Sequence, residues 1–283
     1  MSAGVAAGES IDKTLPVQSD GKVSISIVRG DVEVSAWDKL EVRVTGELDE
    51  KAGKFIFENS GSETTIKVEL EDDSWGRNWN SGDTELTIYV PRASSIDCGG
   101  VSTDFKITGL QGGVSANSVS GDIEIAKVAK YMSIETVSGD VNVKDSQGKM
   151  KLSSVSGDVT VDGAARQFKV TTVSGDLEAD LELTEYMDLS SVSGDLDVEF
   201  EFAEDGEIEA GTVSGDIILV FHNGQVNARF NLETGPGGDI ENDITKDRPD
   251  SSFIGAETLK FKSGNGKGSV DLETMSGSLV ISN

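Results

Sequence analysis

The sequence has almost none of the residues that disulfide frameworks and histidine-dependent enzymes need. Among 283 residues there is one cysteine, Cys98, and one histidine, His222. A single cysteine forms no intrachain disulfide, and a single histidine supports no histidine-based metal cluster. We expect Cys98 to be a small buried side chain. His222 precedes Asn223-Gly224, which favours a strand end, and we predict a protein that is not an enzyme.

Basic residues are also scarce, and long apolar runs are missing. Lys and Arg number 24 against 51 Asp and Glu, so the formal net charge is −27. This charge repels nucleic-acid phosphates, and it repels anionic lipid head groups unless divalent cations bridge them. No run of 18 apolar residues exists, which argues against a transmembrane segment. The first eight residues have neither a basic region nor an apolar core, so they do not form an intact signal peptide.

Proline is rare, with 4 residues, whereas the 33 glycines recur in a repeated word. Val-Ser-Gly-Asp occupies residues 119–122, 137–140, 155–158 and 173–176, at a period of 18, and Met275–Ser278 is a late altered copy. The aspartates of this column are Asp104, Asp122, Asp140, Asp158, Asp176, Asp195, Asp216 and Asp239. Its glycines are Gly121, Gly139, Gly157, Gly175, Gly194 and Gly215. Glycine admits the positive φ of a tight corner, and Ser and Asp bond nearby backbone groups, so we predict a structural turn ladder.

Apolar residues keep the same period as the corners. Counted from each Asp, offsets +1, +3, +10 and +12 are apolar in most copies, and the valine of each word forms a further apolar column. A Ser or Thr lies four residues before six of these Asp residues, Asp122 to Asp216, which predicts a stacked hydroxyl ladder. Apolar and polar residues alternate as in strands with one buried face, and a coil this short buries that face only by stacking on its neighbours. We therefore predict an all-β, right-handed parallel β-helix (β-solenoid) with coils of ~18 residues.

The regular repeat does not cover the whole chain. We expect residues 1–9 to be a disordered N-terminal remnant, and residues 10–97 to form N-terminal β coils and an irregular cap. Residues 98–283 would form the regular solenoid, with an insertion at about 241–252, in one continuous domain. The last coil stops abruptly at residues 280–283, so we expect a bare end there and a possible route to self-association through the C-terminal coil.

Two features suggest ligands. The polar stretch 72–83 contains Trp75, Arg77 and Trp79, which could stack a sugar or contact a protein, and we take it as the candidate recognition loop. The aspartate column would attract Ca²⁺ if its carboxylates were unsatisfied. However, the word lacks the ligand spacing of known calcium loops, and turn amides offset the repulsion, so we predict structural corners and no cofactor, with Ca²⁺ as the weaker alternative.

The repeated corner, together with two upstream segments, resembles the bacterial putative-adhesin family, a β-solenoid envelope domain. The segments are Gly30-Asp31-Val32-Glu33-Val34-Ser35-Ala36-Trp37-Asp38 and Leu40-Glu41-Val42-Arg43-Val44. The resemblance covers about residues 10–283. It implies export to the periplasm, the cell surface or another part of the envelope, and it carries no catalytic residues.

Two main function classes follow. The first is an exported, non-enzymatic binding, adhesion-like or scaffold module whose partner is an unknown envelope protein or glycan. The alternative is a self-assembling structural protein that forms filaments. A polysaccharide-acting enzyme is a minor alternative, because the corner carboxylates look equivalent and such a site needs two carboxylates in unlike environments.

Overall fold

The computed structural model describes residues 8–71, 83–222 and 224–283. The described residues form strands, turns and bends, and no helix occurs among them. The fold is therefore all-β and solenoid-like, as predicted. The chain divides into two compact units, residues 1–142 (unit 1) and 143–283 (unit 2). The predicted division at residue 97, and the disordered remnant, stay predictions.

The ten strands of unit 1 that end before the boundary are β1 (Ser10–Pro16), β2 (Lys22–Trp37), β3 (Glu41–Glu47), β4 (Ala52–Ser60), β5 (Glu63–Leu70), β6 (Thr84–Pro91), β7 (Ser95–Thr108), β8 (Val114–Ser120), β9 (Ile123–Ala126) and β10 (Tyr131–Ser138). β11 (Val141–Ser156) spans the boundary between the units. Parallel pairing joins β2 to β7, β7 to β8 and β9, and β8 to β10. The pairing places repeat positions of successive coils beside one another.

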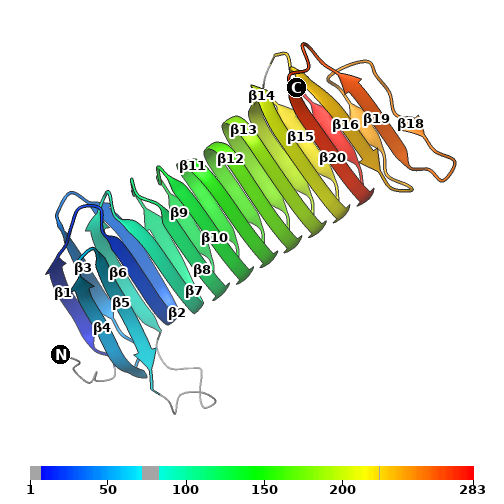
Figure 1. Cartoon of the computed structure of the whole chain (residues 1–283). Coiled ribbons are helices and arrows are strands. Elements are labelled where there is room, and N and C mark those ends of the chain that lie inside the picture. Colours follow the sequence, from blue (N-terminus) through cyan, green and yellow to red (C-terminus); the bar gives the residue numbers. More distant parts are fainter. Residues whose placement is uncertain (1–7, 72–82, 223) are drawn as a thin grey trace. The chain divides into compact units, whose positions relative to one another are not determined.

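The order of the coils in unit 1 differs from their order in the chain. β2 pairs with β7 on one side and with β5 and β6 on the other, so the coil that contains β2 lies between coils that come later in the sequence. Antiparallel strands complete this end, because β4 pairs with β5, β3 with β6, and β1 with β3. Figure 1 shows β1, β3 and β4 beyond β2.

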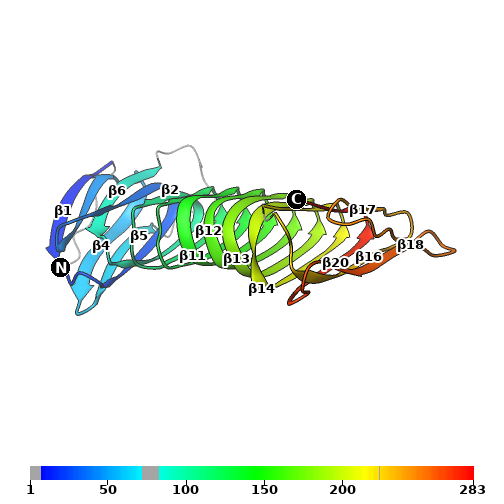
Figure 2. The ribbon, with the colours of Figure 1, turned by 90° about the horizontal axis from the view of Figure 1, so that it is seen from above.

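Unit 2 continues with β12 (Val159–Ser174), β13 (Leu177–Ser193), β14 (Leu196–Ser214), β15 (Ile217–Phe221), β16 (Ala228–Thr234), β17 (Ile240–Asn242), β18 (Asp250–Ser251), β19 (Glu257–Lys262), β20 (Gly268–Ser276) and β21 (Leu279–Ser282). β12, β13 and β14 pair in parallel, and Figure 2 shows them as successive turns of chain. Each is one long strand with a register shift near its middle, where the chain bends from one face to the other.

The expectation of a bare C-terminal coil is wrong. β20 pairs with β14 on one side and β16 on the other, and β21 lies likewise between β15 and β17. The outermost strands on one face are instead β19, antiparallel to β16, and β18, antiparallel to β19. The residues between β15 and β20 leave the path of the regular coils. The last coil, β20 and β21, then lies between the preceding coil (β14 and β15) and strands β16 and β17. Self-association through this coil stays a prediction, without the open edge that motivated it.

The core of each unit lies between its strand-covered faces. The largest fully buried side chains include Phe105 in unit 1 and Phe168, Phe200 and Phe221 in unit 2. Burial of one such side chain contributes about 1.5–3 kcal/mol. Near the C-terminal coil, the rings of Phe200 and Phe221 lie 4.9 Å apart, and those of Phe221 and Phe230 lie 6.0 Å apart. Stacked coils thus build a core that no single coil contains.

Candidate functional site

Within each unit, a carboxylate joins the corner of one coil to the corner of the next. In unit 2, an Oδ1 atom of Asp158 accepts a hydrogen bond of 2.9 Å from the backbone N–H of Asp176. Asp176 accepts in the same way from Asp195 at 2.9 Å, and Asp195 from Asp216 at 2.8 Å. Unit 1 repeats the contact from Asp122 to Asp104 at 2.8 Å and from Asp140 to Asp122 at 2.9 Å. The carboxylates accept from amides that the tight turn takes out of the strand ladder.

The last two members of the column depart from this pattern. Asp216 accepts from the N–H of Ser278, the serine that replaces aspartate in the altered final word. Asp239 repeats the backbone contact of the other corners, because its carbonyl accepts from the N–H of Leu279 at 2.9 Å, as that of Asp216 does from Leu196. Both contacts reach the final coil, in accordance with its position between coils that precede it in the chain.

The corner glycines combine positive φ with close approach of the neighbouring coil. Their φ angles run from 130° at Gly175 to 148° at Gly194 among the six predicted positions. A Cβ atom on Gly175 would lie 2.3 Å from the carbonyl oxygen of Gly157, and one on Gly194 would lie 2.2 Å from that of Gly175. Both conditions exclude side chains, so each glycine is required by the corner itself.

The hydroxyl column is buried beside the corners. Its members are Ser118, Thr136, Ser154, Thr172, Ser191 and Thr212, each at most 7% exposed. Ser118 stacks on Thr136, and Ser191 on Thr212, by strand register. Ser118 and Ser154 each donate 3.3 Å hydrogen bonds to backbone carbonyls, of Thr103 and Gly157. The hydroxyls thus line the interior of the corner, and the hydrogen bonds of these two serines run to the backbone.

The valine column does not belong to the core, and the prediction of a further buried apolar column is wrong there. In unit 2, Val155, Val173, Val192 and Val213 are 44–52% exposed, and Met275 continues the column at 55%. Val101, Val119 and Val137 are equally exposed in unit 1. The reason is parity: offsets +10, +12 and +14 point inward along one strand, so the Ser or Thr at +14 is buried and the valine at +15 points to solvent.

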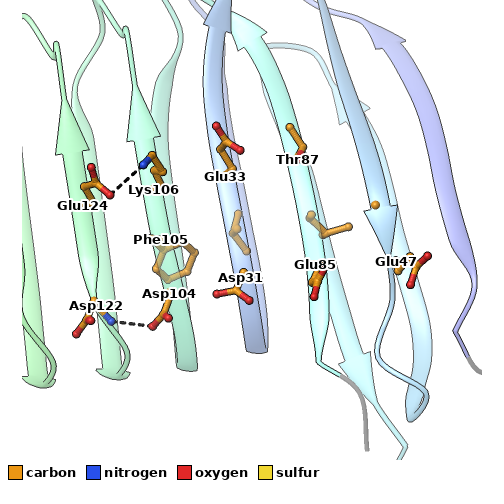
Figure 3. Close-up of a pocket in the computed structure, with 13 residues that line it drawn as sticks. Asp31, Glu33, Glu47, Glu85, Thr87, Asp104, Phe105, Lys106, Asp122 and Glu124 are labelled. Carbon is orange, nitrogen blue, oxygen red and sulfur yellow. Dashed lines mark hydrogen bonds and ion pairs between the residues drawn. The ribbon is translucent and has the colours of Figure 1, made fainter.

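A shallow acidic depression of about 770 Å³ lies on one face of unit 1. Figure 3 shows its carboxylates in rows across neighbouring strands, with Asp31, Asp104 and Asp122 in one row. The acidic lining residues are Asp31, Glu33, Glu47, Glu85, Asp104, Asp122 and Glu124. Lys106 also lines it and makes a 3.1 Å ion pair with Glu124. Burial, followed by the charges of Asp104 and Asp83, raises the pKa of Asp31. The depression therefore favours cations over anions.

Sequence reasoning missed this depression because register, rather than local sequence, brings its residues together. β2 lies beside β6 and β7, so Glu33 meets Thr87 and Lys106 from segments far along the chain. The available signal was the acidic residue two positions after the corner Asp in two of these coils, Glu33 and Glu124. A smaller depression of about 310 Å³ in unit 2, with Asp188, Glu209 and Asp271 in its lining, has the same origin.

The residues with the most reactive side chains lie apart from both depressions. Cys98 is buried, and burial raises the pKa of its thiol, which keeps it from acting as a thiolate nucleophile. His222 is exposed, with Nε2 3.2 Å from a carboxylate oxygen of Glu199. Trp75, Arg77 and Trp79, the predicted recognition loop, lie outside the described residues.

Arg29-Gly30-Asp31 spells a known cell-attachment word and aligns with the repeat corner. Arg29 is buried and paired with the buried carboxylate of Asp49. A cell-attachment role would need Arg29 at the surface, so the word belongs to the corner. Among described residues, no group of three or more acidic, His or Cys side chains is arranged to hold a metal ion. In the same part of the chain, no helix is long and apolar enough to cross a membrane.

No curated protein matches the chain. Among solved structures, a putative adhesin from Bacteroides fragilis is similar at 14% identity and a TM-score of 0.49, over 98% of this chain and 100% of that one. A putative lipid binding protein from Parabacteroides distasonis shares 11% identity over 98% of each chain, with a TM-score of 0.43. A putative cell adhesion protein from Clostridium sporogenes shares 10% identity over 97% of this chain and 99% of that one, with a TM-score of 0.26.

Identities and TM-scores this low transfer no function to the chain. The family comparison is more informative, because a single pattern matches residues 21–282 and so includes both units, the corner repeat and the upstream segments. The resemblance inferred from those segments is confirmed, and the chain belongs to the Toastrack DUF4097 family.

Proposed function

We propose that the chain is a non-enzymatic binding, adhesion-like or scaffold module of the bacterial envelope, located in the periplasm or at the cell surface. One observation carries the proposal: each unit exposes a column of valines where its own core does not need them. In unit 2 the column comprises Val155, Val173, Val192, Val213 and Met275. Contiguous exposed apolar side chains mark interaction sites more often than scattered ones do.

The column has the form of a recognition surface. Parallel rungs repeat at about 4.8 Å, so the valines form a straight apolar stripe, with the corner aspartates in a parallel acidic stripe three residues further along the chain. Because the carboxylates accept from backbone amides, as those of Asp158 and Asp176 do, the stripe is held in a fixed geometry. A fixed surface loses little entropy when a partner binds. The partner we propose is an envelope protein or glycan.

The corner hydrogen bonds and the strand pairing weigh against the other candidate functions. The corner aspartates of successive coils have like surroundings, whereas a polysaccharide-cleaving pair needs two unlike carboxylates. Carboxylates that accept amide hydrogen bonds have fewer oxygens to offer to Ca²⁺, so we propose no cofactor. Filament growth is not favoured at the final coil, which is paired on both sides.

We propose a right-handed winding of the coils, the hand that parallel crossover connections almost always adopt.

The test compares the full-length chain with a Val173→Ser/Val192→Ser variant. Both would be exposed to an envelope extract, with cross-linking and identification of the captured species. A Thr171→Ala/Ser190→Ala variant, altered at two exposed positions of the same strands, is the matched control. We expect the valine variant, but not the control, to lose at least one specific partner. Identical capture by all three proteins would contradict the proposal, as would recovery of the native chain only from the cytoplasmic fraction of its host.

A further inference from the structure

The turn between β18 and β19 presents two large apolar side chains to solvent. Phe253 has a relative exposure of 106% and Ile254 of 67%, the two highest values among the large exposed hydrophobic residues of the described chain. A value near 100% means that the Phe253 ring makes almost no contact with its own protein. Burial of an aromatic ring is among the larger contributions available to a fold, so its full exposure calls for a physical explanation.

Hydrogen bonds within residues 252–256 fix the conformation of this turn. Ser252 N–H donates to the carbonyl of Ala256 at 2.8 Å, and Ala256 N–H donates to the Ser252 hydroxyl at 3.0 Å. Gly255 has a φ of 82° and donates to the Ser252 carbonyl at 3.0 Å. Gly237 N–H donates to the Gly255 carbonyl at 3.1 Å, which attaches the turn to the preceding loop. These bonds oppose the collapse of Phe253 and Ile254 onto the protein.

The base of the hairpin is equally well attached. The ring of Phe261 in β19 stacks on Phe230 of β16, with centroids 4.5 Å apart and planes 2° apart. The Glu257 carboxylate accepts from Ile240 N–H and from the Ser251 hydroxyl, both at 2.9 Å. Figure 1 shows β18 and β19 at the outer edge of unit 2. The apolar tip therefore projects from a fixed support.

The charge of this segment differs from that of the rest of the chain. Residues 244–262 contain four exposed cations, Lys246, Arg248, Lys260 and Lys262, and three acids, Asp247, Asp250 and Glu257. The difference, four minus three, is +1, in a chain whose formal net charge is −27, and one of the four cations, Lys260, pairs with Glu233 of β16 at 3.3 Å. One of the three acids, Glu257, is turned toward backbone and hydroxyl donors.

We propose that the turn at residues 252–256 inserts Phe253 and Ile254 into the interface of a lipid bilayer, with the surrounding cations at the level of the phosphates. A bilayer matches both features of the turn, because its apolar interior accepts Phe253 and Ile254 and its phosphate layer attracts the cations. Strand addition by a protein is disfavoured here, because β18 has two residues and follows Pro249, which lacks an N–H donor. Two side chains bury less apolar surface than one acyl chain, so the contact is weak and reversible.

The direct experiment is flotation of the full-length chain with phosphatidylcholine vesicles, alone or with a fraction of phosphatidylglycerol. We expect Phe253→Ser/Ile254→Ser to lower the vesicle-bound fraction by about tenfold, which corresponds to about 1.4 kcal/mol. The matched control is Leu40→Ser/Tyr131→Ser, which removes two exposed apolar side chains in unit 1, outside the valine column, and should change binding less than about twofold. The anionic lipid should strengthen tip-dependent binding, because the segment is locally cationic.

A second measurement detects weak insertion. Ile254→Cys, labelled with an environment-sensitive fluorophore, should show a blue-shifted and brighter emission when vesicles are added, whereas the same label at Leu40→Cys should not. The buried native Cys98 leaves the introduced thiol as the reactive one. An unchanged spectrum at residue 254, or equal flotation of tip variant and wild type, would overturn the proposal. Tip-dependent capture of a protein without any vesicle effect would also overturn it and would identify a protein partner instead.

Discussion

At the scale of single residues, the corner requires a glycine, which has no Cβ atom. Gly175 has no Cβ, and the carbonyl of Gly157 occupies the space where one would lie. The carboxylate of Asp158 then reaches the amide of Asp176 in the next coil. The repeated word was recognisable from the sequence because each of its residues meets a local demand of the backbone.

Gly175→Ala should destabilise unit 2 strongly. The substitution combines a φ of 130° with a Cβ 2.3 Å from a backbone oxygen, so we expect a loss of at least about 2–3 kcal/mol in the free energy of unfolding. Gly211→Ala is the control, because its Cβ would have as its nearest neighbour only the Glu273 oxygen at 3.9 Å. Urea denaturation monitored by circular dichroism measures both. Equal stability of the two variants would refute the corner geometry.

Asp49→Ala should destabilise unit 1. Asp49 is fully buried and pairs with Arg29, whose side chain is 8% exposed, and its carboxylate raises the pKa of that guanidinium. Removal of one partner from a buried ion pair costs about 3–5 kcal/mol, and we expect the low end of this range because the exposed Asp83, 3.7 Å from Arg29, remains as a second partner. Asp12→Ala, which removes an exposed partner of Arg43, should cost far less. Similar midpoints for both variants in chemical denaturation would show that the Arg29–Asp49 pair is not buried.

Asp31→Asn should stabilise the protein at neutral pH. Burial and neighbouring carboxylates raise the pKa of Asp31, so its ionised form weakens the folded state. The penalty is present above the folded-state pKa and disappears as the pH falls below the ordinary value of 3.8. We expect a gain below about 1 kcal/mol at pH 7, reduced by solvent screening, that vanishes near pH 3. Thermal unfolding across this range measures it, and a gain that grows with acidity would have the wrong sign.

At the scale of strands, the prediction succeeded where periodicity determines the fold and failed where parity or long-range pairing does. Alternation correctly placed Met132 and Ile134 in the core. It misplaced Val173 because the buried position beside the corner is taken by Thr172. A hydroxyl at an inward position looks polar in the sequence, although it can satisfy its hydrogen bond inside the fold, as Ser154 does with a backbone carbonyl.

The position of β20 and β21 could not be predicted from local sequence. Both strands alternate as any final coil would, and only their pairing partners, β14 and β16 for β20, show that they lie between earlier coils. The acidic depression in unit 1 escaped prediction for the same reason. Its carboxylates come from strands whose sequence separation hides their proximity.

Deletion of residues 268–283 should open unit 2 rather than shorten it. The truncation removes β20 and β21 from between paired strands, so the backbone groups of β14 and β16 that face β20 lose their partners. We expect rapid hydrogen exchange at Ile208 and Asn231, whose amides face β20, together with aggregation. The control removes only Ser282 and Asn283, and should leave both amides protected. Unchanged protection in the longer truncation would place the final coil outside the unit.

At the scale of the whole molecule, charge and repetition serve different purposes. Stacked coils with exposed valines have a tendency to associate, and a net charge of −27 opposes that association. The same charge makes residues 244–262, with a formal charge of +1, distinct from the rest of the chain. Family membership accounts for the repeat across residues 21–282, while the valine column and the Phe253 turn are where we place binding.

The most direct test of the account is disulfide trapping between neighbouring coils. Thr171 of β12 and Ser190 of β13 are exposed register partners, and parallel strands lie about 4.8 Å apart, within the Cα separation that a disulfide bridges. Mild oxidation of the Thr171→Cys/Ser190→Cys variant should produce an intramolecular cross-link, identified by peptide mass mapping. Thr171→Cys/Asp180→Cys should remain reduced. Efficient cross-linking of the second pair, or none of the first, would contradict coils stacked in register.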